Sequence, residues 1–244
     1  MHIRATAIIC AVRPHGEHGA VVRVMMRDHG LMGGYVQGAR GRSLRPILIP
    51  GNRVMIGLSA RTAAQLPSAS VELIHSYGPL MGEPLAAAAL NWVTVLTAYA
   101  LPEAHPYPRL YDMVEAVLAA IEAAPAARGW AAALVRYELM LLAELGFGLD
   151  LSRCAVTGGR DDLRWVSPKS GCAVSSAAGA DYAAKLLVLP PFVREGVHVN
   201  SWEAILAGLT LTGHFLERRI FTDDRRDILA TRTRMVDRLA HAAR

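Results

Sequence analysis

The stretch RATAIICAVRPHGEHGAVVRVMMRDHGLMGGYV, residues 4–36, alternates runs of aliphatic residues with short groups of turn-forming residues. The groups HGEHG and DHG interrupt the runs, and this pattern predicts β-strands joined by tight turns. It continues to about residue 77. We expect five strands, at residues 4–13, 20–27, 31–39, 53–60 and 68–77. Five short strands in so little chain predict a small β-barrel.

One connection in this region is longer than the others. Residues 40–52, RGRSLRPILIPGN, separate the third expected strand from the fourth, whereas tight turns join the first three. The five-stranded OB-fold is a barrel of this size, and the long connection lies where that fold usually has its longer excursion. The spacing favours an OB-fold, and an SH3-like or other small barrel is the alternative that periodicity leaves open.

The sequence changes character after Gly78-Pro79. Alanine- and leucine-rich stretches predict helices at residues 84–101, 110–123, 128–145, 182–189, 201–220 and 225–242. Ser201 precedes one of them and is a candidate N-cap. Residues 151–179 are rich in turn-forming residues and predict irregular structure. We expect an α+β multidomain protein with an OB-fold domain at 1–79, an all-α domain formed by 80–150 and 180–244, and an insertion at 151–179.

The insertion carries two cysteines at the spacing of a zinc ribbon. Cys154 and Cys172 each stand where a C-x-x-C knuckle would begin, but Thr157 and Ser175 replace the second thiols. Because a structural zinc site needs four good donors and neutral hydroxyls are poor ones, we expect a degenerate ribbon without zinc. The alternative is that two cysteines fall at this spacing by chance. The residues expected to pack the ribbon are Leu163, Trp165 and Val166.

Composition excludes several classes of protein. The chain has 244 residues, of which 52% are hydrophobic, so it can build a core and is not expected to be disordered. No window of about eighteen residues is free of charge and proline, and no signal peptide is expected. Three cysteines do not make a disulfide framework. These features predict a cytoplasmic protein with no membrane association.

Basic residues concentrate in the first third of the chain. Residues 1–77 contain nine arginines and three acidic residues, whereas residues 78–152 contain three arginines and eight acidic residues. Arginines on a sheet face can pair with phosphates and stack on bases, as in single-strand binders, although a solvated arginine face is the simpler alternative. No P-loop, G-x-S-x-G or H-E-x-x-H motif is present, so we expect no enzymatic activity and no cofactor.

The order of these parts resembles the RecO family of bacterial recombination mediators. The resemblance is carried by AIICAVRPHGEHGAVVRVMMRDHGL (7–31) and GGYVQGARGRSLRPILIPGNRV (33–54), and continues through VRYELMLLAELGFGLDLSRCAVTG (135–158) and VSPKSGCAVS (166–175). It implies an OB-fold, a helical domain and a zinc-ribbon-like insertion. It also implies binding of single- and double-stranded DNA, annealing of complementary strands and, with RecR, loading of recombinase onto DNA coated by single-strand-binding protein (SSB). Thr157 and Ser175 depart from the zinc-bearing members.

The resemblance and the basic barrel together give candidate sites. We predict a nucleoid-associated protein in which residues 40–52 act as a mobile clamp on DNA. Arg136, on the third expected helix, is our candidate for binding the acidic-hydrophobic C-terminal tail of SSB, with a surface ion pair as the alternative. An RNA-binding OB-fold protein and a protein-only adaptor remain open. The predicted DNA-binding residues are Arg13, Arg23, Arg27, Arg40, Arg42, Arg45 and Arg53.

Overall fold

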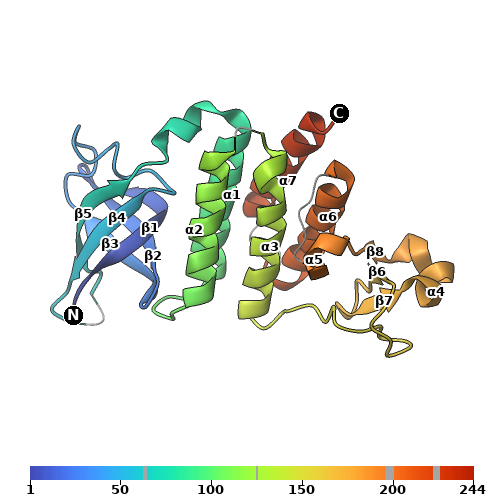
Figure 1. The fold of residues 1–244 in the computed structure, drawn as a ribbon. Helices are drawn as coiled ribbons and strands as arrows, with labels where there is room; N and C mark the ends of the chain where they lie inside the picture. The colour runs from blue at the N-terminus through green and yellow to red at the C-terminus, as the bar shows by residue number, and fades with distance from the viewer. Residues whose placement is uncertain (63–64, 125, 196–200, 222–225) are drawn as a thin grey trace. The chain divides into compact units, whose positions relative to one another are not determined.

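The computed structural model describes residues 1–62, 65–124, 126–195, 201–221 and 226–244. Contacts divide the chain into two compact units, Met1–Ala123 and Ala124–Arg244 (Figure 1). The first unit therefore includes two helices beyond the barrel. The three domains expected from the sequence, with boundaries at 79, 150 and 179, stay a prediction.

The first unit begins with a closed five-stranded barrel. Its strands follow the order β1-β2-β3-β5-β4, in which β3 and β5 are parallel and the other neighbours are antiparallel. This ring confirms the OB-like barrel predicted from the sequence. The strands are β1 (His2–His15), β2 (Gly19–Met26), β3 (Gly30–Val36), β4 (Arg53–Ser59) and β5 (Ser68–His75).

The middle of β1 is buried on both faces. Ala7 and Ile9 lie in the barrel core, and the alternating residues Ile8 and Cys10 are buried as well. Successive side chains of a strand point to opposite faces, so β1 must be covered on its outer side. The cover is helix α1 (Pro84–Ala100), which packs against β1 and β2. This two-sided burial explains the unbroken apolar run AIIC at 7–10.

The excursion between β3 and β4 is a series of hydrogen-bonded turns. Gly38 adopts a φ of +67°, a left-handed conformation that glycine adopts without steric cost. The Gly41 amide donates to the Gly38 carbonyl over 2.8 Å, and the Arg45 amide donates to the Gly41 carbonyl over 3.0 Å. These bonds wind residues 38–48 into a compact loop.

Apolar side chains anchor this loop to the barrel. Two of its residues belong to the buried barrel core, and two more pack against that core. The excursion is therefore anchored to the barrel core at these residues. Its expected role as a mobile clamp on DNA stays a prediction. The anchoring residues are Ala39, Leu44, Ile47 and Leu48.

Two helices and one short turn complete the first unit. A 3₁₀ turn, η1 (Gly78–Gly82), leads into α1, and α2 (Pro108–Ala123) follows α1 and packs against it. Pro84 occupies the first turn of α1, where its missing amide hydrogen leaves no helical bond unmade. Both helices confirm the ranges predicted from the sequence to within two residues.

Three long helices form the main body of the second unit. They are α3 (Arg128–Glu144), α6 (Trp202–Arg219) and α7 (Arg226–Ala242), and α6 packs against both α3 and α7. The Ser201 hydroxyl accepts a hydrogen bond from the Ala204 amide over 3.3 Å, which confirms the predicted N-cap. None of the helices in the described part of the chain has both the length and the apolar character that crossing a bilayer requires.

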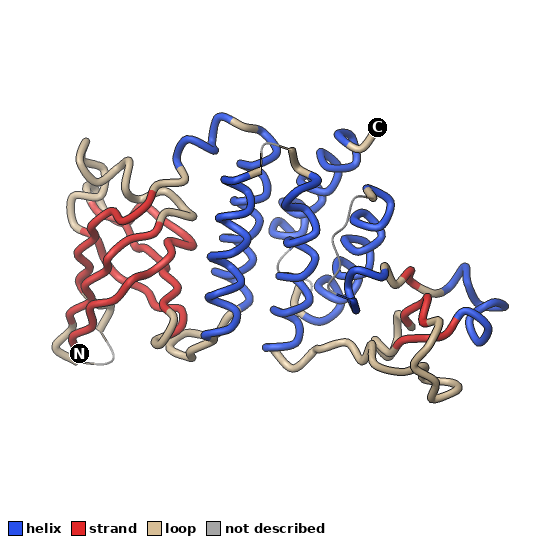
Figure 2. Tube along the Cα trace, viewed as in Figure 1, coloured by secondary structure: helices blue, strands red, loops and turns tan. Residues whose placement is uncertain are grey.

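A small antiparallel sheet lies between α3 and α6 in the sequence (Figure 2). Its strands are β6 (Leu163–Val166), β7 (Ala173–Ser175) and β8 (Leu187–Val188), in the order β7-β6-β8. The short helical segments around it are α4 (Ser176–Gly179), η2 (Ala180–Lys185) and α5 (Pro191–Glu195).

The helix predicted at 182–189 is wrong. Residues up to Lys185 form the 3₁₀ segment η2, and the next residues pair with β6. Leu187 lies opposite Val166, and Val188 lies opposite Trp165. This pairing overrides the helical propensity of the alanine- and leucine-rich stretch, because tertiary contacts outweigh local preference in so short a segment.

Candidate nucleic-acid interface

The seven arginines predicted to contact DNA fall into two groups. Four contact α1, α2 or the segment between these helices, and we call them the paired arginines. Three lie on the excursion, and their side chains have no hydrogen bond or ion pair with any described residue; we call them the loop arginines. The paired arginines are Arg13, Arg23, Arg27 and Arg53. The loop arginines are Arg40, Arg42 and Arg45.

Two paired arginines reach α1 and the residues after it. Arg13 donates to the Tyr99 hydroxyl, and its guanidinium lies 5.4 Å from the centre of that ring. Arg23 donates to the Ala98 carbonyl at the end of α1 and lies 3.3 Å from the Glu103 carboxylate. A cation at this end complements the helix dipole. The Arg23 side chain is 26% exposed, so it acts mainly within the unit.

The other two paired arginines face acidic residues of α2. Arg27 binds Asp112 with both branches of its fork, through Nε at 2.9 Å and Nη2 at 3.1 Å. The hydrogen bonds from Arg27 lower the pKa of the Asp112 carboxyl. Arg53 Nε lies 2.9 Å from Glu115 Oε1. The acids that balance these charges come from α2, which belongs to the acidic middle of the chain.

The loop arginines differ from the paired arginines in their surroundings. All three are exposed, and Arg40 and Arg45 line a cavity of about 300 Å³ between the excursion and the β1–β2 hairpin. We call this cavity the arginine pocket. Apart from its two arginines, the pocket is lined by apolar residues and glycine. These are Val12, Pro14, Gly19, Ala20, Ala39 and Leu48.

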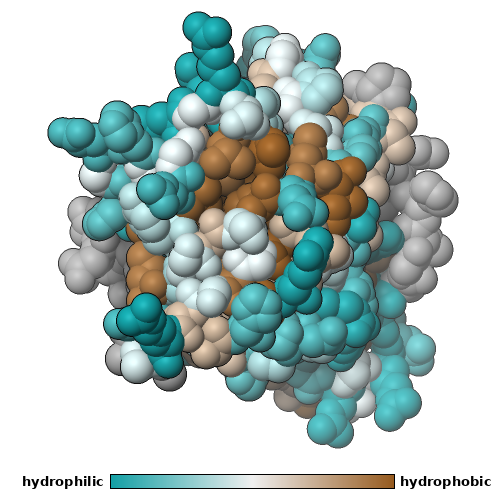
Figure 3. Space-filling view, turned by 90° about the vertical axis from the view of Figure 1, so that its left-hand side faces the viewer, coloured by the Kyte–Doolittle hydropathy of each residue, from teal (hydrophilic) through white to brown (hydrophobic). Residues whose placement is uncertain are grey.

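The face of the molecule drawn in Figure 3 is mixed in character. Figure 3 shows hydrophobic residues gathered in the middle of this face and hydrophilic residues projecting around them. An apolar surface surrounded by polar groups is typical of a binding site. This face thus combines accessible apolar surface with hydrophilic side chains around it.

Asn52 fixes the end of the excursion, and sequence reasoning did not single it out. Its side chain is fully buried and donates to the carbonyls of Pro46 (3.2 Å) and Ile47 (3.0 Å). Its Oδ1 atom accepts from the Tyr77 amide over 2.9 Å. One amide side chain therefore ties the excursion to the segment after β5. The P-G-N turn at 50–52 was the available signal, because asparagine is common in turns.

Arg136 lies on α3 and contacts an aromatic residue. Its guanidinium is 5.8 Å from the centre of the Phe192 ring, and Phe192 is buried. Arg136 itself is half-buried. The acid nearest in sequence, Glu138, binds Arg232. Its role toward an SSB tail stays a prediction.

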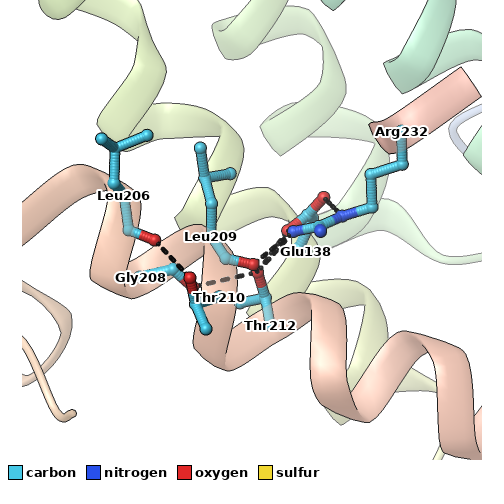
Figure 4. Close-up of polar contacts among 7 residues, drawn as sticks. All are labelled: Glu138, Leu206, Gly208, Leu209, Thr210, Thr212 and Arg232. Atoms are coloured by element: carbon cyan, nitrogen blue, oxygen red, sulfur yellow. Dashed lines mark hydrogen bonds and ion pairs between the residues drawn. The ribbon is translucent and has the colours of Figure 1, made fainter. Parts of the chain in front are cut away.

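Glu138 is the centre of a buried polar network in the second unit (Figure 4). Arg232 Nε donates to Glu138 Oε1 over 2.9 Å, and Arg232 Nη2 donates to Oε2 over 2.8 Å. Thr212 donates to the same carboxylate, and the Leu209 carbonyl accepts from Arg232 over 2.6 Å. A Cβ atom at Gly213 would lie 2.3 Å from Arg232 Nη1, so glycine leaves room for the guanidinium. The network joins α3, α6 and α7.

The two predicted knuckles lie side by side. The Ala155 amide donates to the Ala173 carbonyl over 2.8 Å, and the Ser175 amide donates to Cys154 Sγ over 3.3 Å. Burial opposes ionisation of the Cys154 thiol, but hydrogen bonds from Ser175 and Thr157 outweigh it and lower its pKa to about 6. A backbone amide thus donates to the sulfur of the first knuckle, although that knuckle has only one thiol.

Comparison with known proteins covers both units. The family model described as recombination protein O N terminal matches residues 1–77, and recombination protein O C terminal matches residues 81–226. The chain belongs to the RecO family. It is 42% identical to the DNA repair protein RecO of Phenylobacterium zucineum over 100% of both chains. It is also 42% identical to the RecO proteins of Rhodospirillum centenum (97% of this chain, 94% of the relative) and Caulobacter vibrioides (97% and 96%).

RecO membership assigns the chain to DNA repair and recombination. RecO proteins are non-enzymatic recombination mediators. A non-enzymatic mediator acts through binding. The features of the structure that bear on its function are therefore its surfaces and their charges. The exposed loop arginines and the arginine pocket are such features.

Zinc does not fit the ribbon of this RecO chain. Within the described ranges, no group of three or more His, Cys, Asp or Glu side chains is placed to hold a metal ion. Cys154 Sγ is hydrogen-bonded to Ser175, and Cys172 Sγ donates to the Ser170 carbonyl over 3.8 Å. Two thiols and two hydroxyls make a weak donor set for zinc. The buried residues Leu163 and Val166 contribute to packing here instead.

Restoring the missing thiols is expected to restore a metal site. The Thr157→Cys/Ser175→Cys variant should bind one zinc ion per chain, because it supplies four thiolates at the two knuckles. The unaltered protein should hold far less than one zinc ion per chain. Metal analysis after dialysis against zinc measures the zinc content of both proteins. The matched control is Ser43→Cys/Ser70→Cys, which adds two exposed thiols in the first unit, away from the knuckles. Equal zinc in the two variants would contradict the assignment of the knuckles.

Proposed function

We propose that this chain binds single- and double-stranded DNA through its loop arginines and anneals complementary strands. With RecR, it then helps load recombinase onto SSB-coated DNA. The observation that carries the proposal is the set of exposed loop arginines without ionic partners among the described residues. Arginine forks match phosphate geometry and carry their charge at every physiological pH.

The proposed mechanism is electrostatic. Two complementary strands repel each other through their phosphates, and a basic surface that neutralises phosphates on both strands lowers this repulsion. No bond is made or broken. The paired arginines contribute less in this proposal, since Asp112, Glu115 and Glu103 already balance three of them.

The protein partners are part of the same proposal. We propose that Arg136 binds the acidic-hydrophobic tail of SSB, because its guanidinium flanks an aromatic ring and an acidic tail needs a cation beside an apolar surface. Holding the tail would concentrate this protein on coated DNA. Such a partnership also predicts association with the nucleoid in the cytoplasm.

The loop arginines provide the test. The Arg40→Gln/Arg42→Gln/Arg45→Gln variant should bind single-stranded DNA at least tenfold more weakly at low salt. Its log–log salt dependence should become flatter by about two, because each phosphate contact contributes about 0.7 on a single strand. Fluorescence anisotropy with labelled DNA at several salt concentrations measures both quantities.

The matched control removes the same charge from arginines that already have acidic partners. These are changed in Arg4→Gln/Arg27→Gln/Arg53→Gln, whose partners are Glu72, Asp112 and Glu115. We expect a much smaller loss of DNA affinity in this control. Equal losses in the two variants would place the DNA surface elsewhere. Tighter binding of RNA than of DNA would favour an RNA-binding OB-fold protein. No binding of either nucleic acid would favour a protein-only adaptor.

A further inference from the structure

The arginine pocket combines an apolar lining with two exposed cations. Its apolar lining includes Val12, Ala20 and Leu48, of which Ala20 and Leu48 belong to the buried core. Its lining also includes the exposed Arg40 and Arg45, whose side chains have no ionic partner in the described part of the chain. The pocket therefore suits a ligand in which a flat apolar group lies next to an anionic group.

The pocket is also held in a fixed shape. The hydrogen bond from the Arg45 amide to the Gly41 carbonyl places Arg40 and Arg45 on successive turns of the excursion. Apolar residues beneath these turns anchor them to the core. A preformed site loses little conformational entropy when a ligand enters.

We infer that the arginine pocket receives one unpaired nucleobase of a DNA strand, while Arg40 and Arg45 hold the neighbouring phosphates. This inference rests on the proposed function and deepens it, because it sets a preference between single and double strands. A base in an aliphatic pocket is covered by apolar side chains and can stack against a guanidinium plane. A base within a duplex enters only after unpairing and unstacking, which costs free energy.

The test compares DNAs that differ only in their bases. The probes are labelled oligothymidine, an oligomer of the same length with abasic tetrahydrofuran residues, and a duplex of the same length. All three carry phosphates, so electrostatic binding alone does not separate the first two. We expect the full-length protein to bind oligothymidine about fivefold or more tightly than the abasic oligomer, from the size of base contacts in other single-strand binders.

A substitution that fills the pocket should remove this difference. Val12→Phe places a larger side chain at the pocket wall, and oligothymidine should then bind only as well as the abasic oligomer, with the salt dependence unchanged. Val21→Phe is the matched control, since Val21 is the neighbouring half-buried valine on β2 that does not line the pocket. It should keep the full preference for bases. Circular dichroism and thermal melting verify the fold of both variants.

The outcomes separate the inference from the function on which it rests. Equal affinity of the unaltered protein for oligothymidine and the abasic oligomer overturns the inference and leaves DNA binding intact. That comparison needs no variant, so a folding defect in Val12→Phe does not prevent a decision. Absence of salt-dependent binding to any of the three DNAs overturns the proposed function itself.

An acidic peptide with a terminal aromatic residue is the other chemistry that an apolar pocket with two cations could hold. A labelled peptide of this kind is titrated in parallel. If Val12→Phe lowers affinity for the peptide and leaves the preference for bases unchanged, the inference is wrong. If Val12→Phe removes the preference for bases and leaves peptide affinity unchanged, the inference is supported.

Discussion

Replacing Glu138 with alanine is expected to destabilise the second unit by about 3–5 kcal/mol, because removal of one partner leaves the other charge buried and unpaired. The Glu138 carboxylate is fully buried, and Arg232 and Thr212 both donate to it. Without the carboxylate, the Arg232 guanidinium keeps only the Leu209 carbonyl and Thr212 as described acceptors. Urea denaturation followed by circular dichroism measures the loss, and we expect the melting temperature to fall by about 10 °C or more.

Two further variants test this explanation. Glu217→Ala makes the same change at an exposed position of α6 and should alter stability by no more than about 0.5 kcal/mol. Glu138→Leu/Arg232→Met replaces the whole ion pair with apolar side chains and should recover most of the stability lost in Glu138→Ala. If the double variant is as unstable as Glu138→Ala, the loss comes from packing rather than from an unpaired charge.

The barrel could be predicted because its signals are local. Alternating apolar runs, tight turns and one long connection all lie within the first 77 residues, and each follows from rules about neighbouring residues. The paired strand β8 could not be predicted in this way. Leu187 and Val188 form a strand only because β6 lies beside them, and nothing in their own sequence distinguishes them from a helix.

The division of the arginines into two groups shows a similar limit for the candidate site. The sequence gathers basic residues in the barrel region, but their acidic partners lie far along the chain. Arg27, for example, is 85 residues from Asp112. Composition alone therefore does not distinguish an arginine whose charge is already balanced from one that remains available for phosphate.

The loop arginines depend in turn on Asn52, and replacing Asn52 with alanine is expected to cost about 3 kcal/mol. The change removes the Asn52 partner of the Pro46 and Ile47 carbonyls and of the buried Tyr77 amide. A buried group left without its hydrogen bond costs about 1–3 kcal/mol, and the two partly exposed carbonyls recover part of the loss through water. Denaturant unfolding measures the loss. Asn91→Ala, at an exposed position of α1, is the control and should stay within about 0.5 kcal/mol.

Asn52→Ala should also weaken DNA binding, although Asn52 is fully buried and cannot touch DNA itself. Its two donated hydrogen bonds hold residues 46–47, next to Arg45, so a loosened excursion presents the loop arginines in many orientations. Asn52→Asp keeps the acceptor for Tyr77 but loses both donated bonds, so it should weaken DNA binding as Asn52→Ala does. Unchanged DNA affinity in a folded Asn52→Ala protein would show that a fixed excursion is unnecessary, and that charge alone, without the preformed shape of the arginine pocket, is sufficient for binding.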